Sequence, residues 1–583
     1  MCDRPANSLK SKLINTRLPC VVALWLAASA FASSSAPLPF VLDMVHDNPG
    51  EPPQATAFRN PQRLAEWGYT AQVIEDGADS CETLDAIGTN IFSSDPEARK
   101  WIEQHAQLLE SRATAAHAAG IKAYAWFQFI VLPKAVVAKF KDRICDSQGR
   151  IDLELPMTQT ILRAQVNELF DRCPSLDGIV VRTGEVYLHD SPHHTASGRT
   201  DESKIQGATA ILRGPRSHTA LLKLLRDEVC VKRGKMLFYR TWDFGDNFHV
   251  NPGYYLKVTD AIEPHTNLVF SIKHQADDFL RMRPFNPTLG IGKHRQIVEV
   301  QCQREAYGKG AHPYYVGDGV INGWEEDALT MKPGKPRALR DLVGNPNFAG
   351  VWTWTRGGGW EGPYITNELW CALNAYVIAK YGQNPARSEE EIFNEYATRQ
   401  LALAGQDLAR FRTLNLLSAS AVLRGQCSLL GPVDLWWARD DYMAAPNLQY
   451  FVANNLVAAA LAEKAEAVAQ WKRIETLARE IHFPDSATQE FVQTSSTYGR
   501  IKYAIFEQAW TILLLRKQGD ATKQYDREQI SKAIDEYDRL WGEWRQLKAD
   551  HPDCATLSKD VAFPGRPGMG AAVNSLRPRF SQR

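Results

Sequence analysis

The feature that most constrains the fold is an alternation of short apolar runs with amphipathic stretches between Pro37 and about Thr355. Eight runs rich in β-branched and aromatic residues have the character of buried strands. They span residues 40–45, 70–74, 121–127, 178–183, 236–241, 268–273, 297–301 and 349–354. Strands joined by helical crossovers, such as those predicted over 95–119 and 157–171, form a parallel sheet. Eight such units predict a (β/α)₈ TIM barrel over residues 37–362.

An open, doubly wound sheet is the structural alternative. That fold commonly carries a glycine-rich motif at the turn after its first strand. The corresponding turn here, His46-Asp47-Asn48-Pro49-Gly50, has no such motif. The barrel is therefore the preferred prediction.

Beyond Gly362 the pattern becomes helical throughout and predicts an all-helical C-terminal domain over residues 363–555. Ser388 and Glu391 form a capping box that opens one helix. One later helix has apolar side chains at spacings of three and four, namely Val457, Leu461, Ala465, Val468, Trp471, Ile474, Ala478 and Ile481. This domain is expected to cover the barrel or to form a homodimer. The Gly-, Pro- and Arg-rich tail over 556–583 is predicted to be disordered.

Residues 1–32 are typical of a signal peptide. Basic residues precede an apolar stretch over 21–32, which ends in the small-x-small sequence Ala30-Phe31-Ala32. The stretch is too short to span a membrane, so we expect a secreted or periplasmic protein with no membrane span after cleavage; a signal anchor is the alternative. Eight of the ten cysteines lie beyond this segment without a CxxC pair, which predicts buried free thiols with one or two bridges.

The composition excludes some classes of function. Lysine and arginine together number 67, as do aspartate and glutamate together. The net charge therefore gives no support for nucleic-acid binding. The chain shows no P-loop, nucleophile elbow or Cys–His signature, and no cofactor is predicted. The segment His189–His194 contains Pro192 and lacks HExxH spacing, so a loop that faces substrate is preferred there over a metal site.

Barrel enzymes carry their chemistry at the C-terminal ends of the strands. Glu185 and Glu305 follow two predicted strands and lie about 120 residues apart, and Asp278 follows a third. Paired carboxylates of this kind carry out glycoside hydrolysis. The cations Arg240, Lys273 and Arg356 at the same ends suit an anionic sugar, with Trp242 and Trp354 as further substrate-binding candidates.

Each of these residues also has a structural interpretation. Glu185 taken alone could pair with Arg182 or Arg240, and Glu299 inside its strand is expected to pair with a barrel lysine or arginine. Asp277 and Asp278 could cap the following turn. The functional prediction therefore depends on the shared location of these side chains.

The block from Asn267 to Phe279, with Arg283-Pro284 and Gly290, resembles the α-glucuronidases of glycoside hydrolase family 67. The stretch from Glu299 to Gly308 is similar to their Glu-Phe-Gln and Gln-Glu-Tyr-x-Gly motifs, and Tyr239-Arg240-Thr241-Trp242 to their Trp-Arg-x-Phe. Asp177-Gly178 with Glu185 is similar to their Asp-Gly and Ser-Glu-Gly. Order and approximate spacing agree over about 130 residues, and that family also has a helical C-terminal domain.

The resemblance implies an inverting mechanism with Glu185 as general acid and Asp278 with Glu305 as the pair that activates water. It implies that Arg240 and Lys273 hold the glucuronate carboxylate. The chain departs from the family in lacking its N-terminal domain, in the loop that contains Glu185, and in Met282-Arg283-Pro284, which stands where the family has Arg-Glu-Pro, so that the Glu of that motif is missing.

We therefore predict an exported glycoside hydrolase that removes a terminal α-linked glucuronic acid from xylan-type oligosaccharides. One alternative is a retaining glycosidase that uses Glu185 as acid/base and Glu305 as nucleophile on another glycan. Its clan has Asn before the acid, where Gly184 stands here. The other alternative is a carbohydrate-binding barrel without catalysis. The expected partner in every case is an oligosaccharide, with an acidic sugar in the first.

Overall fold

The computed structural model describes residues 36–47, 53, 55–75, 77–88, 90–183, 186–188, 190–196, 214–242, 248–276, 279, 281–302, 310–357, 365–432, 447–554 and 568–580. The predicted signal peptide lies outside these residues. Residues 35–583 form one compact unit. No helix in the described part of the chain is both long enough and apolar enough to cross a membrane.

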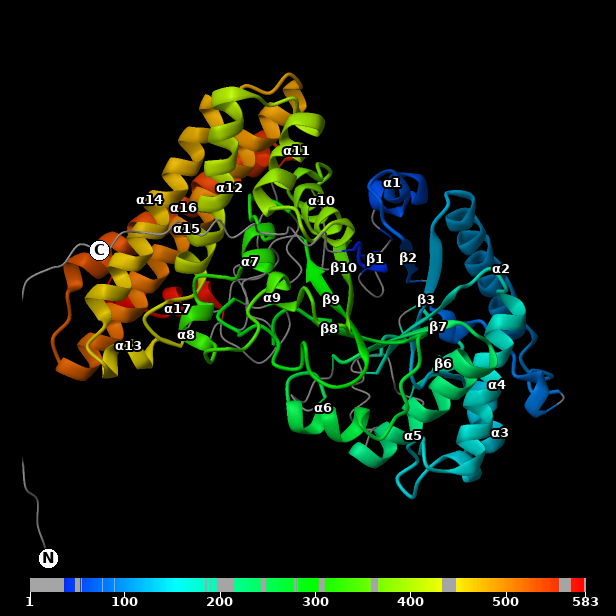
Figure 1. Ribbon diagram of the computed structural model, residues 1–583. Coiled ribbons are helices and arrows are strands. Elements are labelled where there is room, and N and C mark those ends of the chain that lie inside the picture. Colours follow the sequence, from blue (N-terminus) through cyan, green and yellow to red (C-terminus); the bar gives the residue numbers. More distant parts are fainter. Residues whose placement is uncertain are drawn as a thin grey trace, which may run out of the picture. The chain divides into compact units, whose positions relative to one another are not determined.

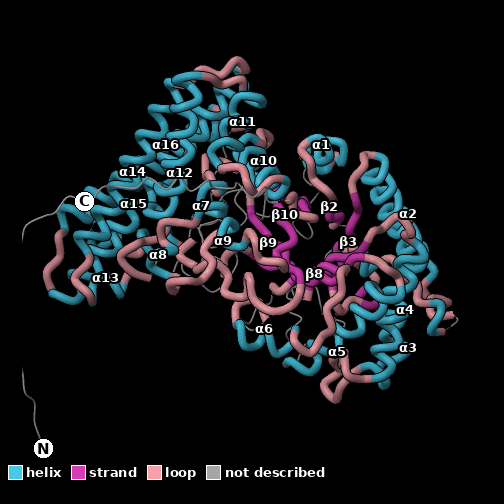
Figure 2. The backbone as a smooth tube through the Cα atoms, in the orientation of Figure 1, coloured by secondary structure: helices cyan, strands magenta, loops and turns pink. Residues whose placement is uncertain are grey.

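Eight parallel strands close into a barrel, which confirms the predicted fold (Figure 1). They are β1 (Phe40–His46), β2 (Ala71–Ile74), β3 (Lys122–Gln128), β5 (Gly178–Arg182), β7 (Met236–Arg240), β8 (Leu268–Lys273), β9 (Arg295–Gln301) and β10 (Phe348–Gly357). Their order around the barrel is β1-β10-β9-β8-β7-β5-β3-β2. Figure 2 shows this ring of strands in magenta, with helices around it. β4 (Leu132–Pro133) and β6 (His194–Thr195) form a separate antiparallel pair.

Helices fill the connections between the strands. They are α1 (Pro61–Glu66), α2 (Pro96–Ala118), α3 (Lys134–Ile144), α4 (Pro156–Arg172), α5 (Pro215–Leu225), α6 (Pro252–Thr259), α7 (Gly317–Asn322), α8 (Asp327–Thr330) and α9 (Leu339–Leu342). Short 3₁₀ turns span Ala57–Arg59, Ala78–Ser80 and Asp85–Ile87, and a π-helical segment, Arg226–Lys232, continues α5. Several of these helices start with proline, because the fixed φ of proline suits the first turn.

The C-terminal region is helical, as predicted. It contains α10 (Leu369–Gln383), α11 (Glu389–Leu401), α12 (Gly405–Gln426), α13 (Gln449–Ala453), α14 (Val457–Glu480), α15 (Ser486–Thr522), α16 (Arg527–Asp550), α17 (Met569–Asn574) and α18 (Arg577–Phe580). Both hydrogen bonds of the capping box at the start of α11 are present. The backbone N–H of Glu391 donates to the Ser388 hydroxyl oxygen, and the backbone N–H of Ser388 donates to the Glu391 carboxylate. Helices α17 and α18 differ from the disordered tail expected there, because Met569, Val573 and Phe580 are buried.

Helix α10 joins this region to the barrel. Gly382 lies so close to Val351 of β10 and Val41 of β1 that a Cβ atom there would be 2.8 Å and 3.1 Å from their side chains. Asn374 donates to the backbone carbonyls of Cys302 and Tyr314, at 2.8 Å and 2.9 Å. The helical region is therefore packed against the barrel wall. The eight cysteines beyond the predicted signal are free thiols in the structure.

Asp43 of β1 is fully buried, and its Oδ1 accepts hydrogen bonds from Thr353 (2.6 Å) and Thr355. Burial raises the pKa of this carboxyl group from 3.8 to about 7. The unfolded chain ionises Asp43 above about pH 4, whereas the folded chain stays protonated to about pH 7. Stability is therefore expected to fall across this range, by about 4 kcal/mol in total.

Asparagine cannot ionise, so replacing Asp43 by asparagine is expected to make the free energy of unfolding fall less steeply as the pH rises. Urea unfolding between pH 5 and 8 measures it. Some slope should remain, because burial also raises the pKa of Asp79 to about 7. A variant whose stability depends on pH as steeply as that of the wild type would contradict this account.

Candidate active site

The barrel interior has an apolar lower layer and a polar upper layer. Leu42, Val73, Phe238, Val269 and Ile297 are among the apolar residues of a buried cluster inside the barrel. Successive side chains of a strand alternate between its two faces, so the inward positions nearest the C-terminal ends can be identified from these residues. They carry His46, Glu75, Gln128, Arg182, Arg240, Lys273, Glu299, Gln301 and Trp354. The polar residues therefore collect at the rim where barrel enzymes have their active sites.

Arg240 and Glu299 form a buried ion pair at this rim. The Nε and Nη2 atoms of Arg240 donate to the two carboxylate oxygens of Glu299, at 2.9 Å and 2.7 Å. Ser271 donates to the same carboxylate at 2.8 Å. The structure thus places Glu299 in the structural pair expected for it. Two of the three guanidinium nitrogens of Arg240 therefore donate to Glu299.

The guanidinium group of Arg240 is enclosed by indole rings. Its Cζ atom lies 4.9 Å, 5.7 Å and 4.8 Å from the ring centroids of Trp126, Trp352 and Trp354, distances typical of cation–π contacts. Its third nitrogen, Nη1, is buried and has no hydrogen-bond partner among the described residues. A buried donor of this kind calls for an acceptor.

Lys273 lies on the neighbouring strand, β8. Its ammonium group is 3.6 Å from the ring centroid of Trp242 and 4.7 Å from that of Phe279, and the residue is buried. The next residue, His274, is also buried, and desolvation lowers the pKa of its imidazole to about 4. Lys273 therefore provides a fixed positive charge at the end of β8, whereas His274 is neutral at physiological pH.

Of the sequence candidates, the structure brings together Arg240, Lys273, Trp242 and Trp354 and separates Arg356 from them. Met44 of β1 pairs with Trp354 of β10 and Val45 with Arg356, so Thr355 is an extra residue in β10. A bulge of this kind changes the face to which later side chains point. Arg356 Nη2 donates to the carbonyl of Ile365 at 2.5 Å, and Nε lies 3.3 Å from Glu368. Its guanidinium group thus contacts the segment that leads into α10.

Three proposed catalytic residues, Glu185, Asp278 and Glu305, lie outside the described residues. They follow the ends of β5, β8 and β9, and these strands end at the same rim of the barrel. In the described part of the chain, no group of three or more His, Cys, Asp or Glu side chains has the geometry of a metal site. His194 packs against Trp101 of α2, with ring centroids 5.7 Å apart, and is buried.

Two residues that the sequence analysis missed, His46 and Glu75, lie at the same rim. Nδ1 of His46 donates to Oε1 of Glu75, and the backbone N–H of Asp47 donates to Oε2 at 2.7 Å. Gln301 was also missed. It is buried, and its Nε2 has no partner within the described residues. All three occupy inward positions that the alternation along the predicted strands would have indicated.

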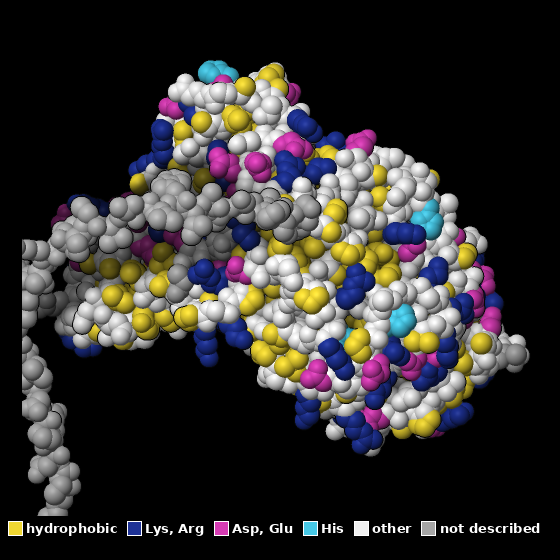
Figure 3. Space-filling view, viewed as in Figure 1, with side chains coloured by type: hydrophobic (Ala, Val, Ile, Leu, Met, Phe, Trp, Pro, Cys, Tyr) yellow, Lys and Arg dark blue, Asp and Glu magenta, His cyan; other side chains and the backbone are white. Residues whose placement is uncertain are grey.

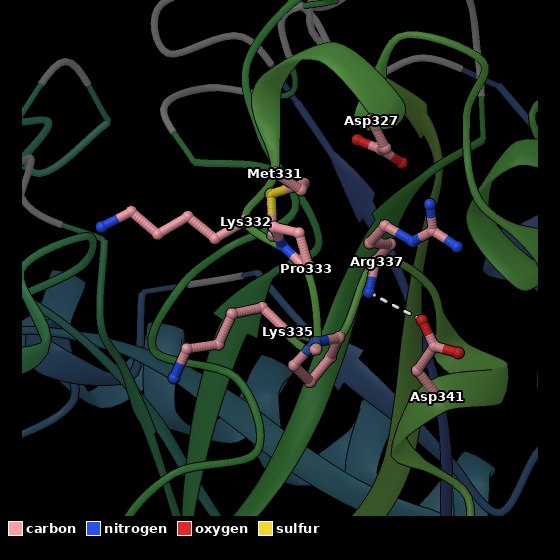
Figure 4. A pocket seen from close by; sticks show the side chains of 9 residues that line it. Asp327, Met331, Lys332, Pro333, Lys335, Arg337 and Asp341 are labelled. Atoms are coloured by element: carbon pink, nitrogen blue, oxygen red, sulfur yellow. Dashed lines mark hydrogen bonds between the residues drawn. The ribbon is translucent and has the colours of Figure 1, made fainter. Parts of the chain in front are cut away.

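A separate pocket of about 630 Å³ lies on the connection between β9 and β10. Figure 4 shows Lys332 and Lys335 on one side of it and Asp327, Arg337 and Asp341 on the other. All of its lining residues come from this one connection, so it shares none with the rim site.

Over the face in Figure 3, acidic and basic side chains are interspersed, as the equal numbers of the two charges suggest.

Comparison with known proteins finds no family model and no curated protein that matches the chain. The structure is similar to that of a GH138 enzyme targeting pectin rhamnogalacturonan II, with a TM-score of 0.54 and 11% sequence identity. The match covers 89% of this chain but only 63% of that one. A second match, an O-GlcNAc hydrolase from Thermobaculum terrenum, has a TM-score of 0.37 and 8% identity over 94% of each chain. At 11% identity the first match shows a likeness of fold to that enzyme alone.

Proposed function

We propose that this protein is a glycoside hydrolase that removes a terminal α-linked uronic acid, with glucuronic acid on xylan-type oligosaccharides as the first substrate to test. The observation that carries this proposal is the unsatisfied donor on Arg240. Nη1 is buried beside three indole rings, and the ammonium group of Lys273 lies on the adjacent strand. The buried amide of Gln301 adds a second donor without a described partner.

A carboxylate matches this set of donors. When ionised it offers only acceptors, and charge-assisted hydrogen bonds to it are stronger than those between neutral groups. Tryptophans around the cations supply flat apolar surfaces for a sugar ring. The rim thus has a suitable place for the acidic group and for the ring that carries it.

The proposed chemistry uses the three carboxylates that follow the strand ends. Glu185 would protonate the leaving oxygen, while Asp278 and Glu305 would orient and deprotonate water on the opposite face of the sugar, with inversion. The retaining alternative would use Glu305 as nucleophile. A barrel that only binds carbohydrate would release no sugar.

The test is to incubate the protein with aldouronic acids and a panel of uronate-bearing oligosaccharides, and to identify the released monosaccharide. We expect free glucuronic acid or its 4-O-methyl form. Because the GH138 structure is that of an enzyme targeting pectin, the panel should include galacturonic acid-bearing pectin fragments. Release of a neutral sugar alone, or binding without release, would overturn the proposal.

A further inference from the structure

The His46–Glu75 pair has the form of a histidine held in one tautomer. Both carboxylate oxygens of Glu75 accept hydrogen bonds from the end of β1. One accepts from Nδ1 of His46 and the other from the backbone N–H of Asp47. Because the carboxylate accepts from Nδ1, the ring lone pair of the neutral imidazole is on Nε2. The His46 side chain is only 8% exposed, so its orientation is fixed by packing as well.

This pair lies across the barrel from the two cations. In the closed order of eight strands, β1 is four places from β7 in either direction, and β2 is four places from β8. His46 and Glu75 therefore face Arg240 and Lys273. The imidazole centroid of His46 is 5.4 Å from the Trp354 ring and 6.4 Å from the Trp126 ring.

The same two indole rings lie 4.8 Å and 4.9 Å from the guanidinium carbon of Arg240. His46 and Arg240 are thus linked through shared aromatic neighbours. Their separation cannot exceed the 4.8 Å and 5.4 Å steps through Trp354 taken together. A single hexuronic acid with its hydrogen bonds can bridge such a distance.

We propose that His46 binds a ring hydroxyl of the terminal sugar and that Glu75 is its positioning residue. In a pyranose uronic acid the carboxylate is on C5, and the C2 and C3 hydroxyls lie at the opposite side of the ring. With the carboxylate at Arg240 and Lys273, these hydroxyls are turned toward β1 and β2. This assignment rests on the proposed function, which places the carboxylate.

Hydrogen bonds near C2 strengthen in the transition state of glycoside hydrolysis. Replacing His46 by alanine is therefore expected to lower kcat/KM by about 10- to 100-fold. The loss should be equal for 4-nitrophenyl α-D-glucuronide and 4-nitrophenyl α-D-glucoside, since both sugars carry the same C2 and C3 hydroxyls. Glu75→Gln should shift the ¹⁵N signals of the His46 imidazole, because the tautomer is no longer fixed, with little change in melting temperature.

The chain offers a matched control at the other end of the barrel. Asp177 holds His117 at 2.7 Å and accepts from the backbone N–H of Ala123 at 3.0 Å, so it repeats the carboxylate–histidine–backbone arrangement away from the rim. His117→Ala should leave kcat/KM within about twofold. Equal losses in His46→Ala and His117→Ala, at equal melting temperatures, would refute the assignment.

Failure of the proposed function would look different. A wild-type protein that prefers the glucoside would refute the acidic sugar, while the comparison of His46 with His117 would still test the hydroxyl contact. If neither glycoside is cleaved, or if His46→Ala does not fold, the wild-type histidine NMR spectrum is recorded with D-glucuronic acid and with D-glucose. Movement of the His46 signals by either sugar supports the contact, and unchanged signals with both overturn it.

Discussion

Replacing Lys273 by methionine is expected to reduce the preference for an α-glucuronide over the matching α-glucoside by roughly 30-fold to several thousand-fold. Lys273 is buried, so its charge acts with little screening from solvent. Loss of one partner of a buried charged pair costs on the order of 2–5 kcal/mol. Methionine is also unbranched and of similar length, but it removes the ammonium group that lies over the Trp242 and Phe279 rings, so the change tests the charge. The measurement is kcat/KM for both 4-nitrophenyl glycosides.

Arg240 needs a different design, because Arg240→Ala would leave Glu299 buried without its cation. Breaking such a pair costs about 3–5 kcal/mol of stability, whereas replacing both partners by apolar residues of similar size is often neutral. The double variant Arg240→Met, Glu299→Leu should therefore fold and lose the same preference. If this variant and Lys273→Met both discriminate as the wild type does, the carboxylate is held elsewhere.

The barrel strands could be predicted from the sequence because each is a short, mostly apolar run containing β-branched or aromatic residues, with helical segments between the runs. The run at 268–273 coincides with β8 (Leu268–Lys273), and that at 178–183 differs from β5 (Gly178–Arg182) by one residue. The helix faces of the C-terminal region follow equally from periodicity, and Val468, Trp471 and Ile474 of α14 are buried as expected. These patterns are local, so one sequence is enough to show them.

Contacts across the barrel could not be predicted in the same way. The sequence indicated that Glu299 would pair with a lysine or arginine, but several cations end neighbouring strands. The register sets Lys273 beside Glu299 and Arg240 beside Ser271, yet it is Arg240 that donates to Glu299. Only the side-chain contacts in the structure therefore show which cation pairs with it. The bulge at Thr355 that turns Arg356 toward α10 has no sequence signal of its own.

His46 and Glu75 were missed for a related reason. Each is a single polar residue at the end of a short strand, and neither is part of a motif. Their meaning comes from closure of the barrel, which sets β1 and β2 opposite β7 and β8. The cations were easier to find, because Arg240 and Lys273 belong to segments that resemble those of a known family.

The largest expected effect concerns the three carboxylates after β5, β8 and β9. Glu185→Gln should abolish most activity on oligosaccharides, since it removes the proton that the leaving group needs. Asp278→Asn and Glu305→Gln should each do the same, because either change removes one member of the pair proposed to activate water. General acid–base catalysis contributes typically about 10²–10⁴-fold, so losses of that order are expected. Lys332→Ala, in the pocket that shares no residue with the rim site, serves as the control.

The stereochemistry of the product separates the two mechanisms. An inverting site has its acid and base roughly 6.5–9.5 Å apart to admit water, whereas a retaining site has them about 5–5.5 Å apart. In the proposed mechanism Asp278 and Glu305 act together on one water, which corresponds to the first arrangement. NMR of the first-formed sugar from an α-linked substrate should therefore show the β anomer. An α anomer, or a glycosyl ester trapped on Glu305, would instead show that Glu305 attacks the sugar directly.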